Sequence, residues 1–237
     1  DGSHGPGLAA LVSAMKRRGH VSVSGPEHER SADSHSLTLH KPIRIRKVKE
    51  DVYTLNGSPA DCARFAILEI LKGKVDLVVS GINRGYNLGE DVIYSGTVAA
   101  AMEATLLKIP AVAFSLNAEA DDYNPAGAVA QRVARQVLRR GLPLGLCLNV
   151  NFPVPPKAGY KTTAAAKLGR RIYGTDISRR CDPRGLEYFW LAGGQVRGVD
   201  EPGTDVGTVS HGAVSITPLL IDNTDHAFLQ ALSSWKF

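Results

Sequence analysis

The stretch VDLVVSGINRGYNLGEDVIYSGTVAAAME, residues 75–103, decides the fold of this 237-residue chain. Its opening run, 75–79, is apolar, rich in valine and too short for a helix, which predicts a buried strand of a parallel sheet. A polar loop follows at 80–85, where that strand should end. Residues 98–103 are strong helix formers. Strand, loop and helix in this order indicate one βα unit of an α/β protein.

The loop and the helix start within this stretch carry candidate binding groups. Ligands of open α/β sheets bind beside the carboxyl ends of the strands, where we expect Asn83 and Arg84 to lie. Ser95-Gly96-Thr97 opens the helix, and hydroxyls, unpaired N–H groups and the positive end of a helix dipole suit an anion such as phosphate. A Ser or Thr before a helix is more often an ordinary N-cap. The nearby Asn/Arg loop favours a binding site.

Helical and extended patterns alternate along the first two thirds of the chain. They predict helices at 8–18, 58–73 and 126–138, and strands at 20–24, 37–49, 52–55, 111–116 and 146–153. This alternation is typical of a doubly wound α/β layer, which we expect over 1–153. Prolines and short polar segments dominate from 154 onward. For this extension of the same domain, 154–237, we expect hairpins, strands at 188–191 and 213–219, turns at 193–194 and 201–205, and a final helix.

The composition is that of a soluble globular protein, with 43% hydrophobic and 22% charged residues. The net charge of +5 fits anionic small molecules and is weak evidence for a nucleic-acid partner. Three scattered cysteines are too few for a disulfide framework or a cysteine-based zinc site, and they favour the cytoplasm. No apolar run approaches the length of a membrane span, so we expect no membrane partner.

The first residues of the chain form a glycine-rich loop that leads directly into a helical pattern. An α/β domain normally places a strand before its first helix, so we expect the sequence to begin inside the first βα unit. Asp1, in this loop, is a candidate metal ligand. A second polar loop, 25–36, lacks apolar periodicity, and long loops within compact domains are often functional.

Several motifs occur together in the order found in one known family. They are Asp1-Gly2, PEHERSA at 26–32, GSPADC at 57–62, SGINRGYNLG at 80–89, YSGTVAAAME at 94–103 and VSITPL at 214–219. On these motifs the sequence resembles the SurE family of stationary-phase survival proteins. The resemblance implies a Rossmann-like core with carboxyl-terminal elements that are swapped to build a homodimer or homotetramer. It also implies a phosphatase for nucleoside 5′- and 3′-monophosphates, with polyphosphate hydrolysis as a side activity.

The resemblance also implies which residues act. One divalent cation, Mn²⁺ or Mg²⁺, is expected on Asp1, Ser31 and Asn83, of which Asp1 and Asn83 are also the expected catalytic residues. The expected contacts to the substrate phosphate are Asn87, Ser95, Gly96 and Thr97. The chemistry is consistent, because hard divalent cations prefer the oxygen ligands that carboxylate, hydroxyl and amide groups supply.

Two other functions stay open at this stage. The chain could be a catalytically weakened protein that binds nucleotides or polyphosphate. It could also bind a polyanion through the basic segment 44–49, although a solvated strand face is the commoner meaning of such a pattern. The sequence has no glycine-Lys-Ser/Thr phosphate loop, which argues against a P-loop ATPase. Ser95 lacks the glycine pattern of a nucleophile elbow, which argues against a Ser/His/Asp hydrolase.

Overall fold

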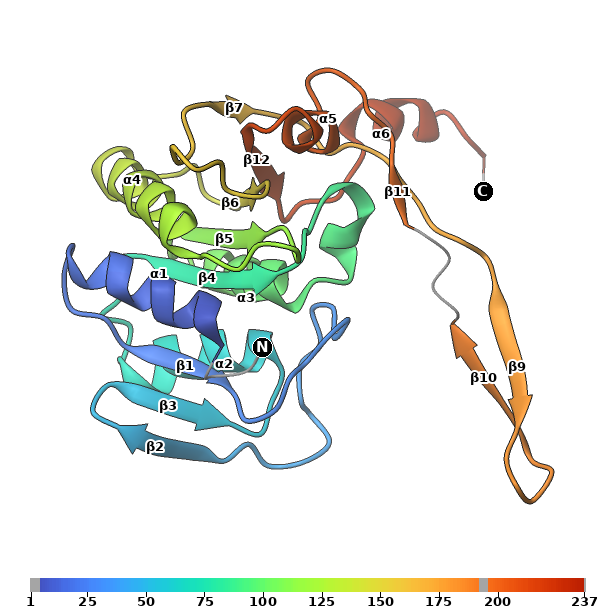
Figure 1. Cartoon of the computed structure of the whole chain (residues 1–237), viewed down its shortest axis with the longest axis horizontal. Coiled ribbons are helices and arrows are strands. Elements are labelled where there is room, and N and C mark those ends of the chain that lie inside the picture. Colours follow the sequence, from blue (N-terminus) through green and yellow to red (C-terminus); the bar gives the residue numbers. More distant parts are fainter. Residues whose placement is uncertain (1–4, 192–195, 237) are drawn as a thin grey trace.

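The computed structural model describes residues 5–191 and 196–236, and its centre is a five-stranded sheet (Figure 1). The sheet has the strand order β4 (Val78–Arg84), β5 (Ala111–Leu116), β6 (Leu146–Phe152), β12 (Val214–Leu220) and β7 (Thr163–Ala165). Strands β4, β5 and β6 are parallel, whereas β12 is antiparallel to β6. A second sheet has the order β1 (Val23–Pro26), β3 (Val52–Leu55) and β2 (Ile45–Lys49), with β1 and β3 parallel.

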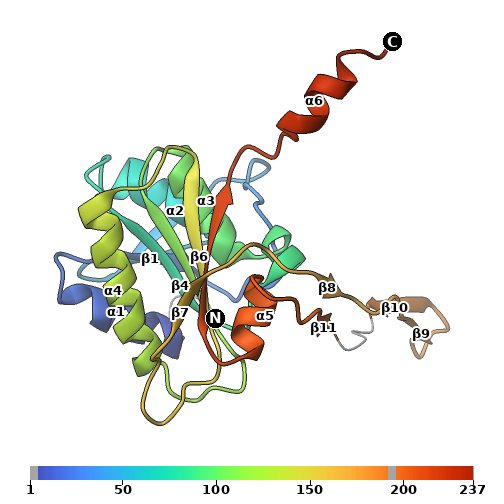
Figure 2. The ribbon, with the colours of Figure 1, turned by 90° about the horizontal axis from the view of Figure 1, so that it is seen from above.

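Helices cover both faces of the main sheet, as the sequence predicts (Figure 2). Helices α1 (Pro6–Lys16) and α4 (Asn124–Arg140) pack on one face, where Phe114, Val150 and Phe152 belong to the larger buried core. Helix α3 (Gly96–Leu106) covers the other face, over the small side chains of β5. The doubly wound, mostly parallel α/β fold is therefore confirmed.

Strand β4 is longer than the sequence predicts. Residues 80–84 are not a loop: they continue the strand, and its pairing with β5 shifts register between Ser80 and Asn83. The prediction ended the strand at Val79 because the following residues are polar. It was wrong there because β5 is buried along its whole length and offers its neighbour backbone partners up to Leu116.

Helix α2 (Pro59–Phe65) begins where its sequence signals place it. Ser58 and Asp61 form a capping box, and a π-helical turn, Ala66–Ile70, continues the helix. Cys62 lies buried in α2, and burial raises the pKa of its thiol to about 12. It is therefore a packing residue and not a nucleophile, in agreement with the helical prediction.

Part of the carboxyl-terminal third, from β8 (Arg171–Ile172) to β11 (Arg197–Gly198), forms an arm that extends from the body (Figure 1). Between these two strands lies the hairpin of β9 (Ile177–Cys181) and β10 (Glu187–Leu191). The turn expected at 193–194 lies outside the described residues. Helix α5 (Asp205–Ser210) was not predicted, because the sequence suggested only a turn there. The final helix, α6 (His226–Leu232), is confirmed.

Strands β1 and β4 face each other across a gap between the two sheets, and within the described ranges they do not pair. Of the helices in the described part of the chain, none combines the length and the hydropathy needed to cross a bilayer.

Candidate functional site

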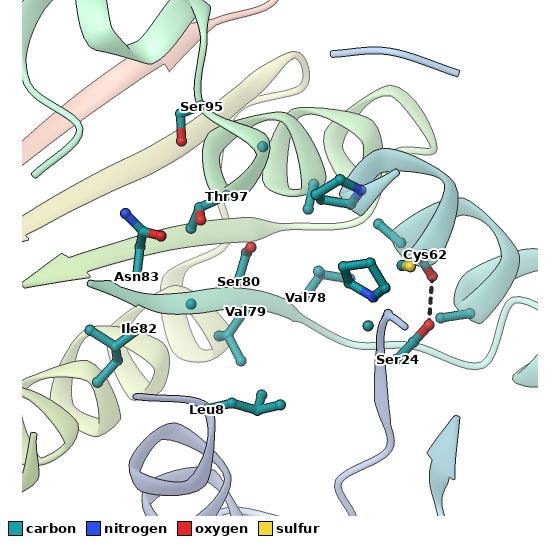
Figure 3. Close-up of a pocket in the computed structure, with 18 of the residues that line it drawn as sticks. Leu8, Ser24, Cys62, Val78, Val79, Ser80, Ile82, Asn83, Ser95 and Thr97 are labelled. Carbon is teal, nitrogen blue, oxygen red and sulfur yellow. Dashed lines mark hydrogen bonds between the residues drawn. The ribbon is translucent and has the colours of Figure 1, made fainter. Parts of the chain in front are cut away.

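A cavity of about 810 Å³ opens between the two sheets. Its lining includes Ser31, Asn83, Asn87 and Ser95-Gly96-Thr97, so the fold brings together every predicted site residue that the structure describes. Figure 3 shows Ser80, Asn83 and Thr97 with their polar ends on the same side of strand β4. Asp1, the predicted metal ligand and catalytic acid, lies outside the described residues. Its role stays a prediction.

Asn83, near the end of β4, is oriented by the backbone that follows the strand. The side-chain Nδ2 donates to the carbonyl oxygen of Gly85 at 3.0 Å. This bond fixes which end of the amide is the donor, and the carbonyl Oδ1 receives no hydrogen bond from any residue in the described ranges. Asn83 therefore presents an oxygen to the cavity, which is the atom a hard cation requires.

Ser31 lies on the loop between β1 and β2, exposed, and its hydroxyl donates to Glu29 Oε1 at 3.1 Å. Glu29 also lines the cavity, and sequence reasoning did not select it. The polar stretch 25–36 indicated a functional loop, but it contains several acids and histidines, and nothing in the sequence favoured Glu29 among them.

The Ser31 loop is attached to the helices behind it. The backbone N–H of Ser34 donates to the carbonyl oxygen of Tyr94 at 3.1 Å, and the Ser58 hydroxyl donates to the carbonyl oxygen of Ser36 at 2.6 Å. His35 Nε2 lies 2.8 Å from Oε2 of the buried Glu103 in α3. These contacts tie a loop without regular structure to α2 and α3, the helices beside the predicted phosphate contacts at Ser95-Gly96-Thr97.

The start of α3 has the cap geometry that the sequence predicts. Ser95 is an ordinary N-cap, because its hydroxyl accepts from the N–H of Val98 at 3.1 Å. A Cβ on Gly96 would lie 2.8 Å from Pro59 Cγ, so this glycine is also needed where α2 meets α3. The N–H groups of Gly96 and Thr97 precede the first intrahelical hydrogen bonds and remain available to an anion.

Asn87 is buried and its peptide group is held by two asparagines of β6. Its N–H donates to Asn151 Oδ1 at 2.9 Å, and its carbonyl oxygen accepts from the Nδ2 atoms of Asn149 at 2.8 Å and Asn151 at 3.0 Å. Its own Nδ2 donates to Ser115 Oγ at 2.6 Å. The side-chain amino group therefore already has a hydrogen-bond partner inside the protein. A contact of Asn87 with phosphate stays a prediction.

Sequence reasoning missed Asn149 and Asn151. The signal was present: the two residues alternate with apolar ones along a strand that is otherwise buried. Buried asparagines require hydrogen-bond partners, and here the partner is Asn87, on the segment that leads to α3.

The site offers oxygen ligands rather than a nitrogen or sulfur cage. In the part of the chain that the structure describes, no three His, Cys, Asp or Glu side chains gather closely enough to form a metal site. The amide oxygen of Asn83 and the hydroxyl of Ser31 suit Mg²⁺ or Mn²⁺ and would leave coordination positions for a ligand.

Comparison with known proteins agrees with this geometry. Residues 1–175 match the family model described as "Survival protein SurE". The chain belongs to the SurE family. It is 45% identical to a protein named 5'-nucleotidase SurE from Geobacter sulfurreducens, over 99% of this chain and 90% of the relative. A protein of the same name from Pelobacter propionicus is 43% identical over 100% of this chain and 97% of its own.

Among solved structures, the SurE protein from Aquifex aeolicus superimposes with a TM-score of 0.87 at 38% identity. The match covers 98% of this chain and 95% of that one.

In this SurE chain a buried carboxylate joins the site to the carboxyl-terminal region. Asp205, fully buried, accepts from the N–H groups of Gly89 at 2.9 Å, Gly169 at 2.7 Å and Val206 at 2.8 Å. Burial raises the pKa of Asp205, and the three N–H bonds oppose that rise. Gly89 has a φ of +51°, and a Cβ there would lie 2.6 Å from the Gly169 carbonyl oxygen. Asp205 thus secures the segment that connects Asn87 with Ser95.

Proposed function

We propose that this chain is a 5′-nucleotidase, a phosphomonoester hydrolase that acts on nucleoside monophosphates. The proposal rests on one observation: a candidate cation ligand and a candidate anion site line the same cavity. The Asn83 amide oxygen is directed to a cation, and the N-terminus of α3 is directed to an anion. The relatives named 5'-nucleotidase SurE support the same activity.

Each group has a physical role in phosphoryl transfer. The N–H groups of Gly96 and Thr97, with the Thr97 hydroxyl, bind phosphoryl oxygens and stabilise the charge that develops on them. Asn149 and Asn151 keep the preceding loop in place, so these donors are oriented before the substrate arrives.

We propose that one divalent cation, Mn²⁺ or Mg²⁺, is held by Asp1, Ser31 and Asn83. Asn83 Oδ1 and the Ser31 hydroxyl are hard oxygen donors on the cavity wall. A bound cation would supply Lewis-acid polarisation of the phosphoryl group and a more acidic water. The hydrogen bond of Asn83 Nδ2 to Gly85 prevents the amide from turning its amino group toward that position.

Metal removal tests the function directly. We expect the purified protein to release phosphate from 5′-AMP in Mn²⁺ or Mg²⁺, and to lose this activity to the background rate in EDTA, because the cation polarises the phosphoryl group. Added Mn²⁺ should restore the rate. Undiminished hydrolysis in EDTA would contradict the proposed metal dependence. Binding of AMP without phosphate release in Mn²⁺ would select the weakened nucleotide-binding protein instead, and polyphosphate can be tested in the same assay.

We also propose that the chain forms a homodimer or homotetramer through its carboxyl-terminal extension. The β9–β10 hairpin projects from the body and exposes large apolar side chains at Ile177, Phe189, Trp190 and Leu191. A lone two-stranded hairpin with such a surface is marginal in water. Multi-angle light scattering should give twice or four times the 25.3 kDa chain mass. A mass equal to one chain at micromolar concentration would contradict this.

The cytoplasm is the compartment that we propose. Cys62, Cys147 and Cys181 are all free thiols, and free thiols are the usual state in a reducing compartment.

A further inference from the structure

Two exposed tyrosines belong to the wall of the cavity beside its phosphate-binding end. Tyr94 is 53% exposed and Tyr173 is 40% exposed, and both line the cavity together with Ser95 and Thr97. Their rings lie edge to face, with centroids 6.4 Å apart and an interplanar angle of 83°. Tyrosines usually bury their ring faces in a protein, so two exposed rings at the opening of a polar cavity are an unusual surface.

A hydrogen bond holds the Tyr173 ring in position, and the Tyr94 ring packs edge to face against it. The Tyr173 hydroxyl donates to Asp91 Oδ1 at 2.5 Å, and Arg171 Nε lies 3.1 Å from Oδ2 of the same carboxylate. The Tyr94 carbonyl oxygen accepts from the N–H of Ser34, which fixes its backbone. The aromatic pair is therefore organised in the absence of a ligand, which lowers the entropic cost of binding one.

Tyr94 stands next to the proposed phosphate site in the chain. It directly precedes Ser95, so its Cα is only about 3.8 Å from that of the N-cap residue. Tyr173 directly follows β8. Strand β8 packs against the short helix Gly89–Ile93, where the N–H of Arg171 donates to Glu90 Oε2 at 2.6 Å. An anion bound at the start of α3 would have the rest of its molecule beside these rings.

We propose that Tyr94 and Tyr173 form a nucleobase subsite, on which the base of a nucleoside monophosphate stacks while its phosphate occupies the start of α3. The inference rests on the proposed function and names the part of the substrate that the phosphate site does not bind. Stacking on aromatic side chains tolerates every base, because each base has a π face. Both oxygens of Asp91 already have protein partners, so the subsite recognises aromatic surface rather than a particular base edge.

The test compares a substrate that has a base with one that lacks it. We expect Tyr94→Ala and Tyr173→Ala each to raise the KM for 5′-AMP on the order of 10-fold, because base stacking on one aromatic side chain is lost. The KM for ribose 5-phosphate should stay within about 2-fold, since it makes no stacking contact. Tyr173→Phe keeps the ring and loses only the bond to Asp91, so its KM for AMP should rise less than that of Tyr173→Ala. Tyr188→Ala is the matched control, since Tyr188 is also 40% exposed but lies on the β10 hairpin.

The outcomes separate this inference from the proposed function. An equal rise in KM for both substrates would show that the tyrosines act on the phosphate site. No rise in KM for either substrate would show that the tyrosines do not contribute to substrate binding. Each of these results overturns the subsite. If the protein hydrolyses neither substrate, the proposed function fails. Calorimetric titration with AMP and with ribose 5-phosphate then tests the subsite. If AMP binds more tightly than ribose 5-phosphate and this difference disappears in Tyr173→Ala, the subsite is supported. Any other result overturns the subsite.

Discussion

Asn83→Ala should lower the metal-dependent hydrolysis of 5′-AMP on the order of 10²- to 10³-fold, the scale of losing one fixed group that stabilises charge in a transition state. The physical reason is the orientation of the side chain. Its Nδ2 is bound to the Gly85 carbonyl oxygen, so its Oδ1 is fixed toward the cavity as an oxygen ligand. Alanine removes that ligand and leaves the backbone of β4 intact. Phosphate release under saturating Mn²⁺ measures the effect.

A matched control keeps this result interpretable. Asn56→Ala removes another asparagine that bonds to nearby backbone, with Oδ1 accepting from Arg44 N at 2.7 Å, but Asn56 does not line the cavity. We expect its activity to stay near that of the wild type. Thermal unfolding should show that the Asn83 variant folds. Turnover at the wild-type rate by a folded Asn83→Ala protein would refute the assigned role.

Asp205→Ala should give the largest loss of stability, about 3–5 kcal/mol in the free energy of unfolding. The fully buried carboxylate accepts from three backbone N–H groups, of Gly89, Gly169 and Val206. Alanine leaves these donors without a partner, and each buried unpaired donor costs about 1–3 kcal/mol before water enters. Urea denaturation followed by circular dichroism measures the change. Asp205→Asn keeps one acceptor oxygen and should fall between the alanine variant and the wild type.

The control for this variant is a neighbouring acid. Asp200→Ala removes an exposed carboxylate that accepts from Ser210 at 3.0 Å, near the same helix. An exposed pair of this kind contributes about 0–1 kcal/mol. If the Asp205 and Asp200 variants lost the same small amount of stability, the buried contacts of Asp205 could not be what holds the loop at Gly89.

Local patterns predicted the elements of the core well. The capping signals at Ser58 and Ser95 act within one helical turn, and both caps are present. The apolar run that predicted β4 was correct in type, but its end was misplaced. Polar residues such as Ser80 and Asn83 can remain in a strand when a neighbour supplies hydrogen bonds, and the neighbour is set by topology rather than by local sequence.

The sequence by itself determined the α/β class, the starts of α2 and α3, and the grouping of Asn83 with the helix start at Ser95. These follow from apolar periodicity, helix capping and the rule that strand ends collect at one edge of a sheet. Only the tertiary structure decided that Asn87 points into the sheet, that Asp205 binds Gly89 across 116 residues, and that Tyr173 lies against Tyr94. Those contacts depend on β5 lying beside β4, and on Tyr173 and Asp205 packing against the segment 89–94. Because they join residues far apart in the chain, no local pattern records them.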